Sequence, residues 1–268
     1  MSNKKKELYK FSIETKILRK NIIQAIYKSK KGHIGGALSC LDAIYFLYKE
    51  KVVTSNTKKQ LNEKPFILSK GHSGTALLAV LEKIFKKKLL KNYNINGSLI
   101  GNNPSELIKG IEFHTGSLGH GPGLGAGIAL GKKILNDKAP VTVLISDGEL
   151  NEGSIWEALQ FIVKHELNIS ILIDNNGQIC DNYFDNVSGI KKFKKIFKSL
   201  GFQYMEINGN LYYDIKKLKN WNLKNKKPRI CVMNTIKGKG VSFMENKIKW
   251  HQSIPNNDEM TIAMKELS

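Results

Sequence analysis

The sequence predicts an α/β fold in which helices cover both faces of a mostly parallel β-sheet. Short strands and helices alternate along the chain, as parallel sheets require, because each strand returns through a crossover helix. Two expected strands, 141–146 (VTVLIS) and 169–174 (ISILID), are almost continuously apolar, which indicates burial on both faces. The 268 residues and 41% hydrophobic content allow one large core, so we expect a single domain, residues 1–268.

The remaining elements follow from hydrophobic periodicity and from glycine turns. In chain order we expect a basic N-terminal tail (1–11), helices at 12–31 and 41–48, a short buried strand within 65–74, a helix at 75–83, an irregular stretch (84–113), a glycine-rich segment that becomes helical (119–134), the strand 141–146, a helix at 155–165, the strand 169–174, two more strands (202–208 and 229–235) separated by a helix at 213–221, and a C-terminal tail (236–268).

The net charge of +20 raises the question of a nucleic-acid or membrane partner. Arginine is the preferred residue for bidentate phosphate and base recognition, and only Arg19 and Arg229 are arginines among the 43 basic residues. Abundant Lys, Asn and Ile instead indicate an AT-rich genome, with lysines that solvate the surface. We therefore expect neither a nucleic-acid nor a membrane partner.

Compartment signals favour the cytoplasm. No apolar run approaches the roughly 18 residues of a membrane span, and no apolar segment follows the basic N-terminus, so no signal peptide is expected. The three cysteines, Cys40, Cys180 and Cys231, are odd in number and widely spaced, which fits a reducing compartment rather than a disulfide framework.

A concentration of carboxylates follows the strand 141–146, in the segment DGELNEG. Asp147 comes directly after that strand, and Asn176 follows the strand 169–174. Ligands of parallel sheets bind beyond the carboxyl ends of strands, and neighbouring strands are about 4.8 Å apart, so both side chains can reach one ion. Carboxylate and amide oxygens suit Mg²⁺ or Ca²⁺ rather than zinc.

Glycines in the same segment suggest what the ion carries. Gly148 and Gly153 allow close backbone approach, and N–H groups at a helix start favour phosphate oxygens. We therefore predict a divalent cation that carries a diphosphate. An Asp-Gly turn with helix-capping acids is the structural alternative.

The unit SDGELNEG…DNN (146–176) resembles the diphosphate-binding motif of thiamine-diphosphate enzymes, with Ser146 in place of the usual first glycine. The resemblance implies that Asp147 and Asn176 are side-chain ligands of Mg²⁺, with Ca²⁺ or Mn²⁺ as alternatives, and that Gln178 supplies its backbone carbonyl. It also places Gly148, Glu149 and Asn176 at thiamine diphosphate.

Four further stretches narrow the family: KGHIGGALS (31–39), FILSKGHSG (66–74), HTGSLGHGPGLGAGIAL (114–130) and TIKGKGVSFMENKIKWHQ (235–252). Together, from about residue 15 to 252, they resemble the N-terminal, diphosphate-binding half of transketolase. The resemblance implies the thiamine-diphosphate-binding fold. It also implies three catalytic histidines: His33 at the donor sugar, His72 at the cofactor and substrate, and His251 at the diphosphate and the substrate.

The same resemblance assigns further roles. Gly116, Ser117 and Leu118 match the loop that embraces the cofactor, and Glu152 and Glu157 match acids that contact the paired subunit. Asn103, in an Asn-Pro pair, replaces the family's substrate-binding histidine. An amide can hydrogen-bond a hydroxyl but cannot carry a proton, which leaves the sugar open. A stripe of glycines every four residues, Gly119 to Gly131, indicates either contact with cofactor or partner, or ordinary helix–sheet packing.

The chain ends soon after His251, so the pyrimidine-binding domain and its activating glutamate are not expected in it. The predicted function is therefore that of the N-terminal half of a split transketolase, which a separate C-terminal subunit completes to form an α2β2 heterotetramer that acts on sugar phosphates. Alternatives are a 1-deoxyxylulose-phosphate synthase-like or 2-oxoacid-dehydrogenase α-like chain, and a non-catalytic relic. The pathway, central carbon metabolism or a dedicated sugar route, stays open.

Overall fold

The computed structural model describes residues 2–54, 63–184, 190–224 and 227–268. In these ranges one sheet has five strands in the order β1-β2-β3-β5-β4, and every neighbouring pair is parallel. The strands are β1 (Phe66–Leu68), β2 (Val141–Ser146), β3 (Ile169–Asn175), β4 (Gln203–Asn208) and β5 (Arg229–Asn234). The predicted parallel sheet is confirmed.

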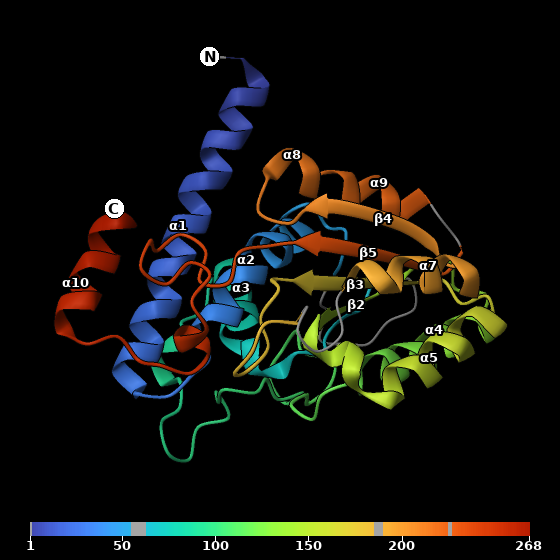
Figure 1. Cartoon of the computed structure of the whole chain (residues 1–268), viewed down its shortest axis with the longest axis horizontal. Helices are drawn as coiled ribbons and strands as arrows, with labels where there is room; N and C mark the ends of the chain where they lie inside the picture. Colours follow the sequence, from blue (N-terminus) through green and yellow to red (C-terminus); the bar gives the residue numbers. More distant parts are fainter. Residues whose placement is uncertain (1, 55–62, 185–189, 225–226) are drawn as a thin grey trace.

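Helices cover both faces of the sheet, as predicted (Figure 1). One face carries α1 (Asn3–Ser29), α2 (Ile34–Lys49), α3 (Gly74–Phe85), α8 (Tyr212–Ile215) and α9 (Lys217–Lys224). The other face carries α4 (Gly121–Ile134), α5 (Gly153–Lys164) and α7 (Ile190–Leu200). Strand side chains alternate between the two cores: Val143 and Ile145 of β2 join the second, and Leu144 joins the first.

The strand register brings three chain segments to one edge of the sheet. Ser146 pairs with Asp174, and Asn175 pairs with Asn234, so β2, β3 and β5 end side by side. The Asp147 N–H donates to the carbonyl oxygen of Asp174 at 3.2 Å. The expectation that Asp147 and Asn176 follow neighbouring strands is therefore confirmed.

Both expected tails contain ordered helix. α1 begins at Asn3 rather than at residue 12, with Ser2 as its N-cap, and its first turns contact α8, where the Tyr213 hydroxyl donates to the Lys4 carbonyl at 3.1 Å and Lys216 pairs with Glu7. Residues 236–268 end in α10 (Asn257–Glu266), which begins with a capping box of Asn256 and Glu259. The Tyr27 hydroxyl of α1 hydrogen-bonds Asn257 and ties the last helix to the first.

Gly123, Gly127 and Gly131 of the glycine stripe face open space, so helix–sheet packing does not explain them, whereas Gly119 packs against Ser154 and Glu152. A Cβ built on Gly123, Gly127 or Gly131 meets no atom within 4 Å. The glycine that does pack on the sheet is Gly125, whose Cβ would lie 2.6 Å from Cγ2 of Val143. The surface of α4 that carries the stripe is open in the described chain.

The two kinds of glycine predict opposite stability effects. Gly125→Ala forces a methyl group into the buried contact with Val143, so we expect a loss of about 1–3 kcal/mol in unfolding free energy. Gly127→Ala adds only helix propensity in open space, so we expect a gain of about 0.5–1 kcal/mol. Urea unfolding of both variants checks this, and equal effects would contradict the packing described.

Candidate functional site

The three predicted histidines meet at the carboxyl edge of the sheet. His33 caps α2, His72 lies in a 3₁₀ turn, η1 (Gly71–Ser73), and His251 ends another, η4 (Ile248–His251). Ring centroids are 5.3 Å apart for His33 and His72, 5.2 Å for His33 and His251, and 5.7 Å for His72 and His251. Residues distant in the sequence thus form one triangle of rings.

The triangle lines a cavity of about 450 Å³. Most predicted site residues line the same cavity: His33, His72, Asn103, Gly116, Leu118, Asp147, Gly148, Asn176, Gln178 and His251. Ser117 is exposed and lies outside the lining. A Cβ on Gly116 would lie 2.5 Å from Nδ2 of Asn103, so this loop needs glycine to approach Asn103.

The predicted metal ligands form an oxygen-rich corner of the cavity. The Asp147 carboxylate accepts from the N–H groups of Gly148 at 2.8 Å and Gly177 at 2.7 Å, and the Gln178 N–H donates to Oδ1 of Asn176 at 3.1 Å. Oε1 of Gln178 is buried and has no hydrogen-bond partner within the described residues. Carboxylate and amide oxygens gathered in this way are the donor set that a hard divalent ion prefers.

The electrostatics of Asp147 point the same way. Burial and the nearby Asp174 carboxylate raise the pKa of Asp147 to about 7, although Lys70 and the two backbone N–H groups oppose the rise. The charged carboxylate is therefore unfavourable in the chain alone. A bound cation would remove that penalty, which supports Asp147 as a metal ligand.

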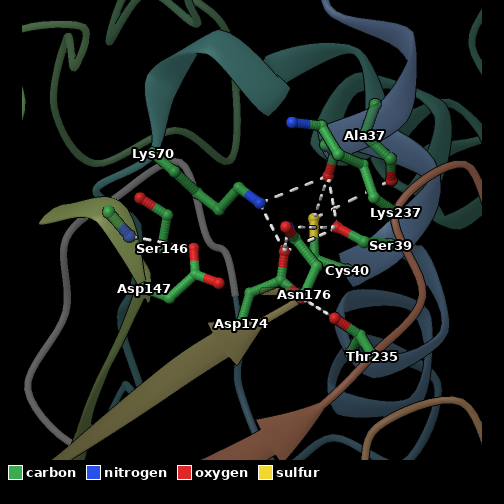
Figure 2. Close-up of polar contacts among 12 residues, drawn as sticks. Ala37, Ser39, Cys40, Lys70, Ser146, Asp147, Asp174, Asn176, Thr235 and Lys237 are labelled. Atoms are coloured by element: carbon green, nitrogen blue, oxygen red, sulfur yellow. Dashed lines mark hydrogen bonds and ion pairs between the residues drawn. The ribbon is translucent and has the colours of Figure 1, made fainter. Parts of the chain in front are cut away.

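A buried ion pair lies beneath this corner. The Lys70 ammonium pairs with the Asp174 carboxylate and also donates to the Gly36 carbonyl at 3.3 Å. Asp174 accepts hydrogen bonds from Ser39 at 2.6 Å and from Thr235 at 2.5 Å (Figure 2). Burial opposes the charge on Lys70, but Asp174 more than offsets it, and the pKa of Lys70 rises. Lys70 is thus a permanent cation held at the strand ends.

A second ammonium, Lys237, is buried, and no carboxylate of the described residues forms an ion pair or hydrogen bond with it. Its Nζ donates to the Ile179 carbonyl at 3.0 Å and lies 3.0 Å from Nδ1 of His251. Burial and the charge of Lys70 lower its pKa to about 8. Lys237 lines the cavity and is 1% exposed, so an anion in the cavity would stabilise its charge.

The three histidine rings beside these two ammonium groups are uncharged. Burial lowers the pKa of His33, His72 and His251, and Lys237 lowers each further; the pKa of His251 falls to about 3. At pH 7 the rings can donate and accept hydrogen bonds without adding charge. The cavity therefore joins a cation-binding corner, two ammonium groups and a neutral hydrogen-bonding surface.

The Glu149 side chain differs from its predicted role. It is fully buried outside the cavity lining, and it accepts from Ser69 Oγ at 2.5 Å, Gly119 N–H at 3.0 Å and Ser146 N–H at 2.7 Å. The carboxylate fastens β1, β2 and the glycine loop together, rather than facing a cofactor. Ser146 joins this network through its hydroxyl, 3.2 Å from Glu149, which explains a serine at this position.

Sequence reasoning did not single out Lys70, Asp174 or Lys237. The two lysines stand inside stretches that carry the family resemblance, but 43 basic residues conceal them. Asp174 offered the clearer signal, since an acid at the end of an apolar strand needs a partner.

Comparison with known proteins identifies the family. Residues 12–268 match the family model for the transketolase thiamine diphosphate binding domain. An apulose-4-phosphate transketolase chain from Phocaeicola vulgatus, itself named as one subunit of that enzyme, is 34% identical over 255 residues, covering 93% of this chain and 91% of that protein. The 6-deoxy-6-sulfo-D-fructose transketolase subunit SqwG from a Clostridium species is 30% identical, covering 95% and 94%. The chain therefore belongs to the transketolase thiamine-diphosphate-binding family.

Longer proteins share the fold. Human transketolase is 30% identical over 251 residues, and the match spans 90% of this chain but 39% of the human protein. The crystal structure of Campylobacter jejuni transketolase superposes with a TM-score of 0.85 at 24% identity, covering 96% of this chain and 42% of that one. In the described ranges none of the helices combines the length and apolarity that a membrane span needs.

The low pKa of Lys237 predicts a pH-dependent gain in stability when its charge is removed. Below pH 8 the ammonium is charged in both folded and unfolded chains, so the folded state bears the full cost of burial, up to about 3 kcal/mol. Between pH 8 and 10.5 the folded state loses its proton first, and the cost disappears. We expect Lys237→Met to be more stable than the wild type at pH 7, with the difference shrinking toward pH 10.5.

Denaturant unfolding from pH 7 to 10.5 measures this difference. Lys239→Met is the matched control, because Lys239 is one-third exposed and pairs with Glu245. A Lys237→Met variant that is less stable at pH 7 would show that Lys237 is a structural cation rather than one held for an anion.

Proposed function

We propose that this chain is the N-terminal, single-domain subunit of a split transketolase. With a separate C-terminal subunit it transfers a two-carbon ketol unit from a ketose or ketose phosphate to an aldose or aldose phosphate, using Mg²⁺ and thiamine diphosphate. One observation carries the proposal: a single cavity joins the oxygen set of Asp147, Asn176 and Gln178 to Lys70, Lys237 and three neutral histidines.

The phosphate end of the cavity would hold the cofactor's charged part. Asp147, Asn176 and the Gln178 backbone carbonyl would bind Mg²⁺, and Gly148 keeps that corner free of a side chain. The Lys237 ammonium would face the diphosphate. When bound, thiamine diphosphate supplies the carbanion chemistry of ketol transfer.

The other end would hold the sugar. His33, His251 and Asn103 line the same cavity and would hydrogen-bond the donor's hydroxyl groups, and the His72 ring lies 5.3 Å from that of His33 and 5.7 Å from that of His251. Because the rings are neutral at pH 7, each can accept a proton at one nitrogen while the other nitrogen donates. Leu118 and Gly116 line the cavity beside these polar groups and would pack against the cofactor's ring.

The open glycine surface is the proposed partner interface. The groove between α4 and α5 includes Gly123 and Gly127, and its rim carries the exposed residues Glu157 and Phe161. Glu152 is exposed beside it, at the start of α5. Two relatives of nearly this chain's length are named as subunits, which supports assembly with a separate chain. We propose that the assembly is an α2β2 complex.

The sugar is proposed by class only. Relatives of comparable length are named for apulose 4-phosphate and for 6-deoxy-6-sulfo-D-fructose, which supports a dedicated sugar route as well as central carbon metabolism. The free cysteines fit a cytoplasmic enzyme.

Calorimetric titration of thiamine diphosphate with Mg²⁺ tests the function. We expect tight binding only when the C-terminal subunit is present, and at least a tenfold loss in Asp147→Ala because a charged metal ligand is removed. Gln24→Ala, at an exposed amide on α1, is the control. Ketol transfer by the single chain, or pyruvate consumption with CO₂ release by the complex, would contradict the proposal.

The interface makes a separate prediction. Gly127→Leu places a bulky side chain in the open groove, so we expect the dissociation constant of the partner complex to rise at least tenfold while the chain stays folded. Gln24→Leu places the same side chain at an exposed position of α1 and serves as the control. Sedimentation velocity measures both, and unchanged association of Gly127→Leu would place the partner elsewhere.

A further inference from the structure

Both ring nitrogens of His33 are engaged by amide side chains. Nδ1 lies 3.2 Å from Oδ1 of Asn102, and Nε2 lies 2.9 Å from Nε2 of Gln252. Asn102 comes from the irregular segment before α4, and Gln252 follows η4, so two separate loops hold one imidazole from opposite sides.

The hydrogen bonds around Asn102 determine which nitrogen carries the proton. Its Oδ1 also accepts from the Tyr93 hydroxyl at 3.2 Å, and its Nδ2 donates to Oδ1 of Asn103 at 3.3 Å. An amide oxygen can only accept, so Nδ1 of His33 must be the donor. In a neutral ring Nε2 is then the acceptor, which matches the Gln252 amide nitrogen that points at it.

The arrangement is anchored in the fold. Tyr93 is 3% exposed, and a Cβ on Gly32 would lie 2.9 Å from its hydroxyl, so the turn before His33 packs directly on Tyr93. Gln252 is exposed at the other end of the array. The chain of contacts therefore runs from the buried Tyr93 to the exposed Gln252, with His33 in the middle.

We propose that Asn102 and Gln252 are positioning residues that fix His33 as the Nδ1–H tautomer, with Nε2 kept as a hydrogen-bond acceptor for a donor-sugar hydroxyl. Asn102 selects the tautomer and Gln252 holds the ring plane until the hydroxyl replaces its N–H. The cavity would thus bind a hydroxyl that donates a hydrogen bond to Nε2 and would disfavour a group that can only accept hydrogen bonds. The statement about the substrate rests on the proposed function; the statement about the tautomer does not.

Nitrogen NMR of the histidine-labelled full chain tests the tautomer directly. The His33 signals are identified by their loss in His33→Gln. We expect Nδ1 to be protonated and Nε2 unprotonated in the wild type at pH 7. In Asn102→Ala the acceptor is gone and the ring should move toward the Nε2–H form, whereas Asn102→Asp keeps an acceptor and should restore the Nδ1–H signal.

Gln252→Glu tests the tautomer with a side chain of the same shape that has lost its N–H donor. A carboxylate cannot donate, so Nε2 would face an acceptor and both ring nitrogens should become protonated at pH 7. Gln24→Ala should leave all His33 signals unchanged. A wild-type Nε2–H tautomer, or an Asn102→Ala variant with unchanged signals, would overturn the inference.

The substrate statement is tested in the complex with the partner chain. We expect Asn102→Ala and Gln252→Glu to raise the KM for the ketose donor about tenfold, with a smaller change in kcat, and Asn102→Asp to restore most of the loss. If the tautomer is as proposed but the complex transfers no ketol unit, the proposed function fails and the positioning role stands. A fall in kcat at constant KM would overturn the substrate statement.

Discussion

The site depends on the buried ion pair between Lys70 and Asp174. It joins the segment after β1 to the end of β3, and hydrogen bonds from Ser39 and Thr235 extend it to α2 and β5. Removal of one partner would leave an uncompensated charge in the interior, at a cost of about 3–5 kcal/mol. Because Asp174 stands two residues before Asn176 and accepts the Asp147 N–H at its carbonyl, this pair also sets where the proposed metal ligands lie and how much negative charge surrounds them.

The rest of the cavity is electrostatically incomplete in the chain alone. Asp147 has a raised pKa, Lys237 has a lowered one, and Oε1 of Gln178 has no partner in the described residues. Each condition is unfavourable by itself, and the proposed occupant, a cation that carries an anion, would relieve the charge penalties at Asp147 and Lys237. Several buried polar groups with shifted pKa values or missing partners thus lie in one place. Such a cluster lowers stability, and it is typical of functional sites.

The sequence predicted those parts of the molecule that local pattern controls. Apolar runs located β2 and β3, and because parallel strands end at one edge, Asp147 and Asn176 could be placed together from the sequence alone. The residues at which the helices begin were harder to predict from the sequence. We expected a helix only from residue 41, yet α2 begins at Ile34. Gly35 and Gly36 lie inside it, where side chains would collide with the Trp250 carbonyl and Ser73 Oγ. Such contacts join residues far apart in the sequence, so no local pattern reveals them, and the pairing of Lys70 with Asp174 was hidden for the same reason.

Different kinds of backbone structure carry the two proposed parts of the cavity, and under the proposed function this difference affects which sugar can be selected. Strand ends and the ion pair hold the proposed metal ligands, where any movement would disturb the core. Loops carry the residues proposed to hold the sugar: Asn102 and Asn103 lie in an irregular segment, and Gln252 follows a single 3₁₀ turn. A change there alters hydrogen-bonding groups without disturbing the sheet. Relatives of this length carry names that specify different sugars. Under the proposed function, the loop residues around His33 would select the sugar of this chain without a change at the strand ends.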